Sequence, residues 1–560
     1  MPGRGRDRMM REEMSKEKVN EVENEKSASS AGDREKPVSA PEDMDNVRSQ
    51  ERIMEQDVPV DPVITVKIER KKWGPALAML SGLLFLLLFS SWTSPIFKGS
   101  YGYDSAFFSM AGRAILNGKV MYRDYFDIKG PVFFFWEALG QLIHTDRIGI
   151  NFLQVICILG ATYFLYRICE IYSLNAKQKI FVFFSMYFVY ATTLWGGNSV
   201  EEYCLPLNMA CIYHGLKYLR REKENLDIAF FYGLTFGICA LSKVTVAAPM
   251  CSIVLVIIID LIRRKKMKEL ARCALLFLGG VLIVAVPVFV YYIARGALDD
   301  MLLCVFKVAF DRGTDYYEGF SVKWELYLTV CYMAMIYWFV RYFRKKDAPV
   351  EKWVLLSMII VIYLALHLGT PFDYYFTTTL PLLTFLAILH CRDVNSAVNM
   401  EEGLMPLKVK KRFLRGFYVA FGGILIVFGA YWEKTSGKVK ENWKIFKEDS
   451  EYKFYQACKE AYETIPEGEK DDLFCVESGM IFYEVNQILP MSKYPVNMPY
   501  FCELYPPAEE EILDTLNNHT PKWLVADRMD EVDNDNIKNA VYEHYEMILE
   551  NSMQQVWRRK

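Results

Sequence analysis

A group of ionisable side chains follows the first long apolar run of the chain. The segment 101–131 reads "YGYDSAFFSMAGRAILNGKVMYRDYFDIKGP" and contains Asp104, Arg123 and Lys129 among aromatic residues. A carboxylate that is held still can act as a general base, and arginine and lysine are natural donors to a phosphate group. Aspartate is also a good helix N-cap, and basic residues beside a bilayer often contact lipid headgroups. The segment therefore predicts either a base beside a bound phosphate or an ordinary interfacial helix start.

A second acidic group lies in "WGGNSVEEYCLP", at 195–206. Glu201 and Glu202 begin an apolar stretch there, and Asn198 follows two glycines. Acids are favoured at a helix N-terminus by the helix dipole, which is the plain interpretation. Ionisable groups at the edge of a membrane interior are costly and often functional, and the glycines let a substrate approach the backbone. We interpret the three polar residues as substrate-binding candidates.

A third candidate group lies in "HLGTPFDYYFTTTLP", at 367–381. It supplies Asp373 and Tyr374, which we expect on the same side of the membrane as Asp104. Tyrosines at such a position are also typical of the aromatic belt at a membrane interface. We include the two residues among the substrate-binding candidates.

The elements that would position these residues are membrane helices. The chain has 560 residues, 52% of them hydrophobic. Apolar stretches of roughly 17–25 residues, the length that spans a bilayer as a helix, recur between about 75 and 432. The expected spans are 75–95, 149–169, 179–196, 201–219, 228–245, 247–262, 271–294, 326–343, 352–368, 374–391 and 412–432. The expected fold class is a polytopic α-helical membrane protein with about 11 transmembrane helices.

Basic clusters orient these spans by the positive-inside rule. The clusters "KIERKKW", "RREKEN", "RRKKMK", "RYFRKK" and "KVKKRFLR" all fall on one side if the N-terminus is cytoplasmic. The stretch 131–144 has only about 14 residues, too few to span, and a crossing there would move the later clusters outside. We therefore expect it to lie in the interface, as does the helical pattern after Asp104. The first outer loop then contains two interfacial helices.

The two ends of the chain are polar. Residues 1–74 contain no apolar core segment, so we expect no secretory signal peptide and a disordered cytoplasmic tail. An odd number of spans places 433–560 outside, where "LFCVES" and "KWLVADR" alternate with helical stretches near 453–464, 509–517 and 536–545. We expect a small extracytoplasmic α/β domain there, on a multi-pass protein of the cytoplasmic membrane.

Several function classes find no support in the sequence. It contains no G-x-x-x-x-G-K-[ST] phosphate loop, no H-E-x-x-H motif and no C-x-x-C pair, so neither ATP hydrolysis nor zinc chemistry is indicated. A formal net charge of −3 says little about partners. We expect no metal, no cofactor and no nucleic-acid partner.

The segment 101–131 resembles the GT-C glycosyltransferases, in particular their bacterial branch of protein O-mannosyltransferases and aminoarabinose-lipid transferases. The resemblance consists of an aspartate just after the first span, a helix ending in Asn-Gly, and then Tyr-Arg-Asp, Phe-Asp and Lys-Gly-Pro. "NSVEEY" is similar to the second acidic site of that family. The resemblance covers 75–432, and a soluble C-terminal domain is often found in such proteins.

The resemblance implies transfer of a sugar from a polyprenyl-phosphate donor to an acceptor in the cell envelope, a glycan, lipid or protein, on the outer face of the membrane with inversion. Asp104 would be the general base, and Lys129 with Arg123 would bind the donor phosphate. Glu201 or Glu202 would orient a substrate. Asp373 and Tyr374 stand where relatives often carry a more basic phosphate contact. The resemblance implies no metal requirement, and the lipid-linked sugar is a substrate rather than a cofactor.

Two other classes remain open alternatives. A multi-span transporter or a flippase of cell-envelope precursors would usually show ionisable groups or broken helices near the membrane midplane. Here the polar groups lie at span ends, with Lys243 as the main exception. A scaffold that acts through the C-terminal domain would leave the residues of 101–131 unexplained. The sequence therefore favours the enzyme.

Overall fold

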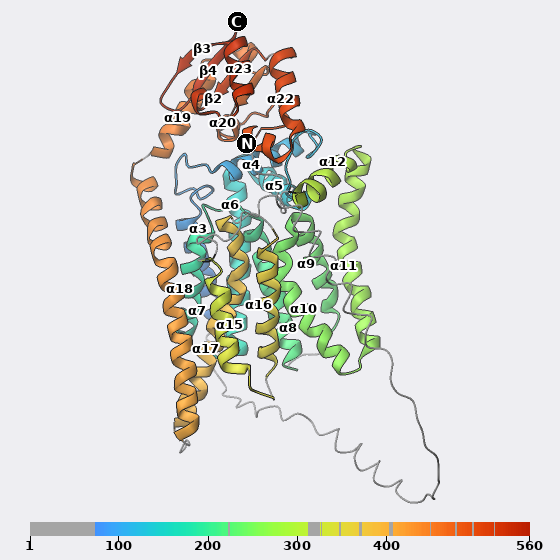
Figure 1. Cartoon of the computed structure of the whole chain (residues 1–560), viewed down its shortest axis with the longest axis vertical. Helices are drawn as coiled ribbons and strands as arrows, with labels where there is room; N and C mark the ends of the chain where they lie inside the picture. Colours follow the sequence, from blue (N-terminus) through green and yellow to red (C-terminus); the bar gives the residue numbers. More distant parts are fainter. Residues whose placement is uncertain are drawn as a thin grey trace, which may run out of the picture. The chain divides into compact units, whose positions relative to one another are not determined.

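The computed structural model describes most of the chain after its N-terminal tail. The described residues are 73–221, 225–311, 325, 327–346, 349–368, 372–401, 407–448, 450–476, 479–495, 498–519 and 521–560. The tail expected at 1–74 therefore lies almost entirely outside the described residues. The apolar part of the chain is helical, and a small sheet follows near the C-terminus (Figure 1).

The apolar part begins with α3 (Gly74–Phe89), α4 (Tyr103–Leu116), α5 (Pro131–Ile143), α6 (Arg147–Ile171), α7 (Ala176–Thr193) and α8 (Val200–Leu219). It continues with α9 (Ile228–Lys243), η1 (Val244–Ala247), α10 (Ala248–Arg263), α11 (Met267–Ala294), α12 (Leu298–Leu302) and η2 (Leu303–Val308). It ends with α15 (Thr329–Tyr342), α16 (Val350–Leu366), η3 (Asp373–Thr379), α17 (Leu380–Glu401) and α18 (Leu407–Glu448).

Each expected span overlaps one or two of these helices, but length and hydropathy alone support fewer crossings. Among the described residues, four helical stretches are long and apolar enough to cross a membrane: Arg147–Ile171, Ile228–Arg263, Met267–Ala294 and Asp373–Ser396. The count of eleven stays a prediction. Helix α5 has 13 residues and is about 20 Å long, short of a bilayer core, which agrees with the expected interfacial position.

Helix α4 has a different environment from the one expected. The sequence predicts an interfacial helix after Asp104, yet two polar side chains of α4, Ser109 and Arg113, are buried. The apolar side of α4 packs on α5, and its polar side packs on α20 (Gly479–Asn486) of the C-terminal unit. Figure 1 shows the two short helices α4 and α5 below the C-terminal elements. The polar stripe therefore meets protein rather than water.

Helix α18 runs through the expected end of the membrane region. It has 42 residues and is about 63 Å long, twice the thickness of a hydrocarbon core. The expected domain boundary at 432/433 lies inside it. Its second half stays in contact with the helices, since Thr435 donates to the carbonyl oxygen of Phe188 and Asn442 to that of Leu88.

The C-terminal unit is an α/β arrangement around one sheet. Its strands are β1 (Leu473–Val476), β2 (Trp523–Ala526), β3 (Tyr545–Glu550) and β4 (Gln555–Arg559), in the spatial order β1-β2-β4-β3. The two expected strands pair in parallel, with Leu473 opposite Trp523, and the other two pairings are antiparallel. The helices and turns of the unit are α19 (Ser450–Glu463), η4 (Glu467–Glu469), α20, α21 (Met498–Leu504), α22 (Pro507–Asn518), η5 (Met529–Glu531) and α23 (Asp535–His544).

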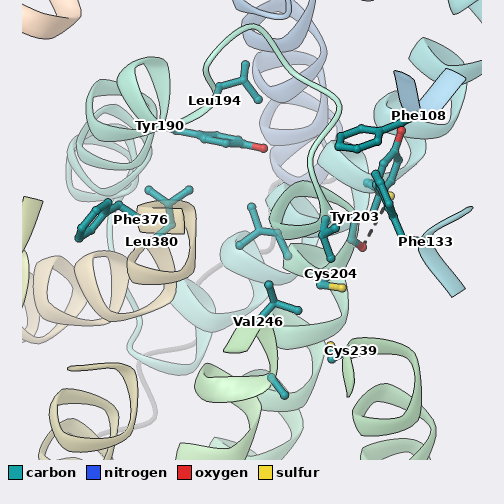
Figure 2. Close-up of a cluster of buried hydrophobic side chains, with 14 of the residues drawn as sticks. Phe108, Phe133, Tyr190, Leu194, Tyr203, Cys204, Cys239, Val246, Phe376 and Leu380 are labelled. Atoms are coloured by element: carbon teal, nitrogen blue, oxygen red, sulfur yellow. Dashed lines mark hydrogen bonds between the residues drawn. The ribbon is translucent and has the colours of Figure 1, made fainter. Parts of the chain in front are cut away.

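An aromatic core joins the helices beneath the expected site. Phe108 of α4 meets the ring of Phe133 of α5 edge-on at 4.8 Å, and Phe133 lies 5.9 Å from Tyr203 of α8 (Figure 2). Aromatic rings bury large apolar areas and prefer such tilted contacts. This core fixes α4, α5 and α8 relative to one another.

Candidate functional site

A cavity of about 210 Å³ collects most of the predicted site residues. Its walls come from the first turn of α4, the loop before α5, the loop before α8, the break between α9 and α10, η2, the end of α16, and η3. Five of the eight predicted residues line it: Asp104, Lys129, Asn198, Glu201 and Tyr374. Segments far apart in the sequence therefore meet at one place.

Asp104 is the second residue of α4 and not its N-cap. The N-cap is Gly102, which makes no side-chain cap, so the N-cap interpretation of Asp104 is wrong. Within the part of the chain that the structure describes, no hydrogen bond or ion pair to the Asp104 carboxylate is found, although the residue is only partly exposed. It lies in the first turn of α4, where the positive end of the helix dipole attracts an acidic side chain. Asp104 thus presents a carboxylate that is ready to accept a proton.

Lys129 is held at the cavity by its neighbours. Its Nζ lies 3.7 Å from Asp127 Oδ2 and 4.5 Å from the centre of the Phe108 ring. The next residue, Gly130, donates from its backbone nitrogen to the carbonyl oxygen of Ser242 at 2.8 Å. A Cβ on Gly130 would overlap the carbonyl of the residue before Ser242, so only glycine permits this approach. The loop before α5 therefore packs closely against the end of α9.

A second lysine lies across this backbone contact. Lys243 adopts an extended backbone (φ −167°) where α9 breaks into η1. Its Nζ lies 2.5 Å from Glu201 Oε1 and 2.8 Å from the centre of the Tyr375 ring. The Glu201 side chain is 1% exposed, and among the described residues its Oε2 has no hydrogen-bond partner. The cavity therefore carries two ammonium groups, each beside a carboxylate.

Asn198 and Glu202 belong to one buried network. The Glu202 carboxylate accepts from the backbone nitrogen of Asn198 and from Gln154 Nε2, both at 2.9 Å. Tyr203 donates its hydroxyl to Asn198 Oδ1 at 2.7 Å. Asn198 has a φ of 67°, in the left-handed region, and this network holds it there. Glu202 lies behind the cavity wall and fixes the loop that carries Asn198 and Glu201.

Two predicted residues lie away from the cavity. The Arg123 guanidinium pairs with Asp124 at 2.9 Å and donates to the carbonyl of Arg295. Asp373 lies 3.8 Å from Lys434 of α18, whereas its neighbour Tyr374 lines the cavity. The structure therefore brings neither Arg123 nor Asp373 to the group around Asp104.

Sequence reasoning missed Glu137 of α5. This residue is completely buried, and its Oε2 accepts from Asn198 Nδ2 at 3.4 Å. Burial raises the pKa of Glu137 to about 8, so the carboxyl is mostly protonated at neutral pH. A single acid within the apolar run 131–143 was the signal available in the sequence. The sequence marks Lys243 only as a polar group that does not lie at a span end. Its contacts with Glu201 and Tyr375 become visible only in the fold.

The described residues contain no group of three or more His, Cys, Asp or Glu side chains arranged to hold a metal ion. The expectation that no metal is required stays a prediction. The arrangement that is present, the Asp104 carboxylate with Lys129 and Lys243, suits proton abstraction and the binding of an anionic group.

Comparison with known proteins gives a family and a fold. Residues 74–403 match the family described as "Putative competence-induced protein Ccs4 N-terminal domain". No curated protein matches the chain.

Two solved structures are similar over nearly their whole length. One is ArnT from Cupriavidus metallidurans bound to undecaprenyl phosphate, with 10% identity over 87% of this chain and 98% of ArnT, and a TM-score of 0.55. The other is the same protein in the apo state, with 9% identity over 86% and 97% of the two chains, and a TM-score of 0.50. At this identity the likeness shows the fold, and the predicted GT-C recognition is confirmed at that level.

Proposed function

Because this chain belongs to the Ccs4 N-terminal domain family and has the GT-C membrane fold of ArnT, we propose that it transfers a sugar from a polyprenyl-phosphate carrier to an envelope acceptor. The observation that carries the proposal is the meeting of Asp104, Lys129 and Lys243 at one cavity. Transfer takes place at the outer face of the cytoplasmic membrane, where a lipid donor and a polar acceptor can meet.

Asp104 acts as the general base. Its carboxylate takes the proton of the acceptor hydroxyl or amine while the acceptor atom attacks C1 of the donor sugar. The bond between C1 and the phosphate oxygen breaks, and its electron pair leaves with the phosphate. A single displacement of this kind inverts the configuration at C1.

Lys129 and Lys243 stabilise the leaving phosphate. A phosphodiester carries one negative charge and the released monoester approaches two, so cations at this position bind the transition state better than the donor. The undecaprenyl phosphate bound to ArnT supports a polyprenyl phosphate as the lipid. Arg123, paired with Asp124 outside the cavity, has no part in this mechanism.

Glu201, Asn198 and Tyr374 contact the sugars. Glu201 Oε2, which has no hydrogen-bond partner among the described residues, can accept from a sugar hydroxyl. Tyr374, stacked 5.4 Å from Trp195, offers an aromatic face. Glu202 and Asp373 support the walls: one holds the Asn198 loop and the other pairs with Lys434.

A lipid flippase is the second candidate. The observation that favours it is the broken helix at Lys243, since interrupted helices with a charged residue are typical of transporters. A flippase would move the lipid phosphate across the membrane without consuming the sugar linkage.

Transfer of a radiolabelled sugar from a polyprenyl-phosphate pool separates the two. Membranes with the wild type should release label from the lipid, and Asp104→Asn and Lys129→Ala should release it only at a small residual rate. Asp227→Asn and Lys268→Ala, surface changes remote from the cavity, are matched controls that should behave as the wild type. Equal transfer by Asp104→Asn would overturn the site, and movement of label between leaflets without its release would favour the flippase.

A further inference from the structure

Helix α4 carries a polar stripe on the face away from its apolar side. Ser105, Ser109 and Arg113 are spaced four residues apart, so they lie one above another on a single face. All three are buried. Asp104 immediately precedes the first of them, so the rotation of α4 about its axis sets the direction in which the Asp104 carboxylate points.

The C-terminal half of this stripe is held by Glu484 of α20. Ser109 Oγ donates to Glu484 Oε1 at 2.8 Å, and Arg113 Nη1 donates to Glu484 Oε2 at 2.7 Å. The Glu484 side chain is 1% exposed. Arg113 also donates from Nη2 to the carbonyl oxygens of Tyr483 and Ile488, each at 3.3 Å. A buried ion pair with both carboxylate oxygens engaged allows α4 little freedom to rotate, because breaking it leaves a buried charge.

The rest of the stripe is held from the membrane side. Gln141 of α5 donates to Ser109 Oγ at 2.7 Å, and Asn198 donates to Ser105 Oγ at 3.2 Å. Asn198 itself lines the cavity. Polar contacts therefore hold the stripe at both ends, on Glu484 through Ser109 and Arg113 and on the cavity wall through Ser105.

The loop that ends in Lys129 is held by the same C-terminal unit. The backbone nitrogen of Phe126 donates to the carbonyl oxygen of Lys493 at 2.8 Å, and the Tyr125 hydroxyl donates to that of Pro490 at 2.8 Å. The Phe126 ring also packs on Tyr494 and other aromatic residues of the unit. Two separate contacts thus connect this unit to the two segments that supply the base and a phosphate-binding lysine.

We infer that Glu484 is a positioning residue for Asp104, and that the C-terminal α/β unit is a working part of the active site. The inference rests on the proposed function. Glu484 lines no part of the cavity and acts through Arg113 and Ser109, which fix the rotation of α4. The unit in this way completes the geometry of a site although none of its described residues lines the cavity.

Glu484→Gln tests the inference because it removes the charge and keeps the volume. A displacement of about 1 Å at a reacting group can lower a rate on the order of 100-fold. We expect kcat to fall roughly 10- to 100-fold with the KM for the donor unchanged, since Lys129 is held by other contacts. Arg113→Lys should show a smaller change of the same kind. Glu469→Gln is the matched control: this glutamate accepts from Trp523 within the same unit, and kcat should stay at the wild-type value.

Combining Glu484→Gln with Asp104→Asn in one protein shows whether Glu484 acts through Asp104. The double variant should transfer sugar at the same residual rate as Asp104→Asn alone. A further loss, or a rise in donor KM equal to the fall in kcat, would overturn the inference, because either result indicates general damage to the fold.

Hydrogen exchange gives a readout that needs no activity. In Glu484→Gln, the backbone amides of 103–108 should exchange faster than in the wild type, and those of α6 and α8 should not. Unchanged exchange at 103–108 would overturn the inference. If the wild type transfers no sugar from any polyprenyl phosphate, the proposed function fails, and the exchange experiment still decides whether Glu484 positions α4.

Discussion

Lys243 lies where α9 breaks into η1 and lines the cavity. It lies 2.5 Å from Glu201, and a short backbone contact joins its neighbour Ser242 to Gly130, next to Lys129. At the cavity this lysine therefore forms an ion pair with a carboxylate. A donor phosphate can take over that lysine, which leaves Glu201 free to accept from a sugar hydroxyl.

Lys243→Ala should lower kcat on the order of 100-fold, because the charge on the leaving phosphate grows in the transition state. Lys243→Arg should retain part of the activity. Steady-state kinetics with a purified polyprenyl-phosphate sugar measures both. Because Lys243→Ala leaves a buried Glu201 charge, Lys243→Ala combined with Glu201→Gln should fold better and remain slow. Wild-type kcat in Lys243→Ala would contradict the role.

Glu137 makes the stability of the protein depend on pH. Its ordinary pKa of 4.5 is raised to about 8 in the folded chain. Between these two values the folded state holds a proton that the unfolded state has lost, so the free energy of unfolding falls as pH rises. The stabilisation is complete below the ordinary pKa and is lost as pH rises through about 8, by at most about 1.4 kcal/mol per pH unit.

Glu137→Gln should flatten this slope, because the amide does not titrate. Thermal unfolding in detergent between pH 5 and pH 9 is the measurement, and the exposed Glu543→Gln is the control that should keep the wild-type slope. An unchanged slope in Glu137→Gln would show that the carboxyl is ionised in the folded chain.

At the scale of elements, the close contact between Gly130 and the end of α9 positions both lysines. Any Cβ at Gly130 would overlap the Leu241 carbonyl, so Gly130→Ala must move the loop before α5. We expect the donor KM to rise about tenfold as Lys129 shifts, in line with the loss of about 1.4 kcal/mol of binding. Gly468→Ala, where a Cβ meets nothing within 4 Å, should be neutral. Equal KM values for the two variants would contradict this account.

Periodicity and turn residues predicted the positions of most helices, because apolar runs of membrane length are strong local signals. They also predicted β1 and β2 but not β3 and β4. In β3, Tyr545–Glu550, most side chains outside the first are exposed, so no apolar run marks it. The helix after Asp104 is predicted to lie in the membrane interface, but its polar stripe packs on α20, because a sequence shows polarity and not which distant helix covers it. The covering helix, α20, lies hundreds of residues away.

Some of the predicted site residues line the cavity and others do not. Asp104 and Lys129 flank helix starts and stops that the sequence displays, and both line the cavity. Arg123 was grouped with them by proximity along the chain, yet its neighbour Asp124 holds it outside. Asp373 was grouped with Tyr374, but Lys434 of α18 draws it away. In both residues an ion pair determines where the side chain lies, and the periodicity of a sequence carries no information about ion pairs.

At the scale of the whole molecule, the proposal requires the cavity to open on the outer side of the membrane. A cysteine introduced at Glu467, whose side chain is 90% exposed in the C-terminal unit, should react with an impermeant maleimide in intact cells. A cysteine at the exposed Lys268, in the first turn of α11, should react only after permeabilisation. Labelling without either cysteine measures the background. The reverse pattern would place the cavity inside and contradict transfer to an envelope acceptor.

The ion pair between Arg113 and Glu484 joins residues 371 positions apart in the chain. At a synthesis rate of 5–20 residues per second, Arg113 leaves the ribosome roughly 20–70 s before its partner. Helix α4 is therefore made long before Glu484, and its rotation can be fixed only after the last part of the chain has been made and has folded. The site around Asp104 is therefore incomplete while the protein is being synthesised. A truncated chain that lacks Glu484 does not complete it.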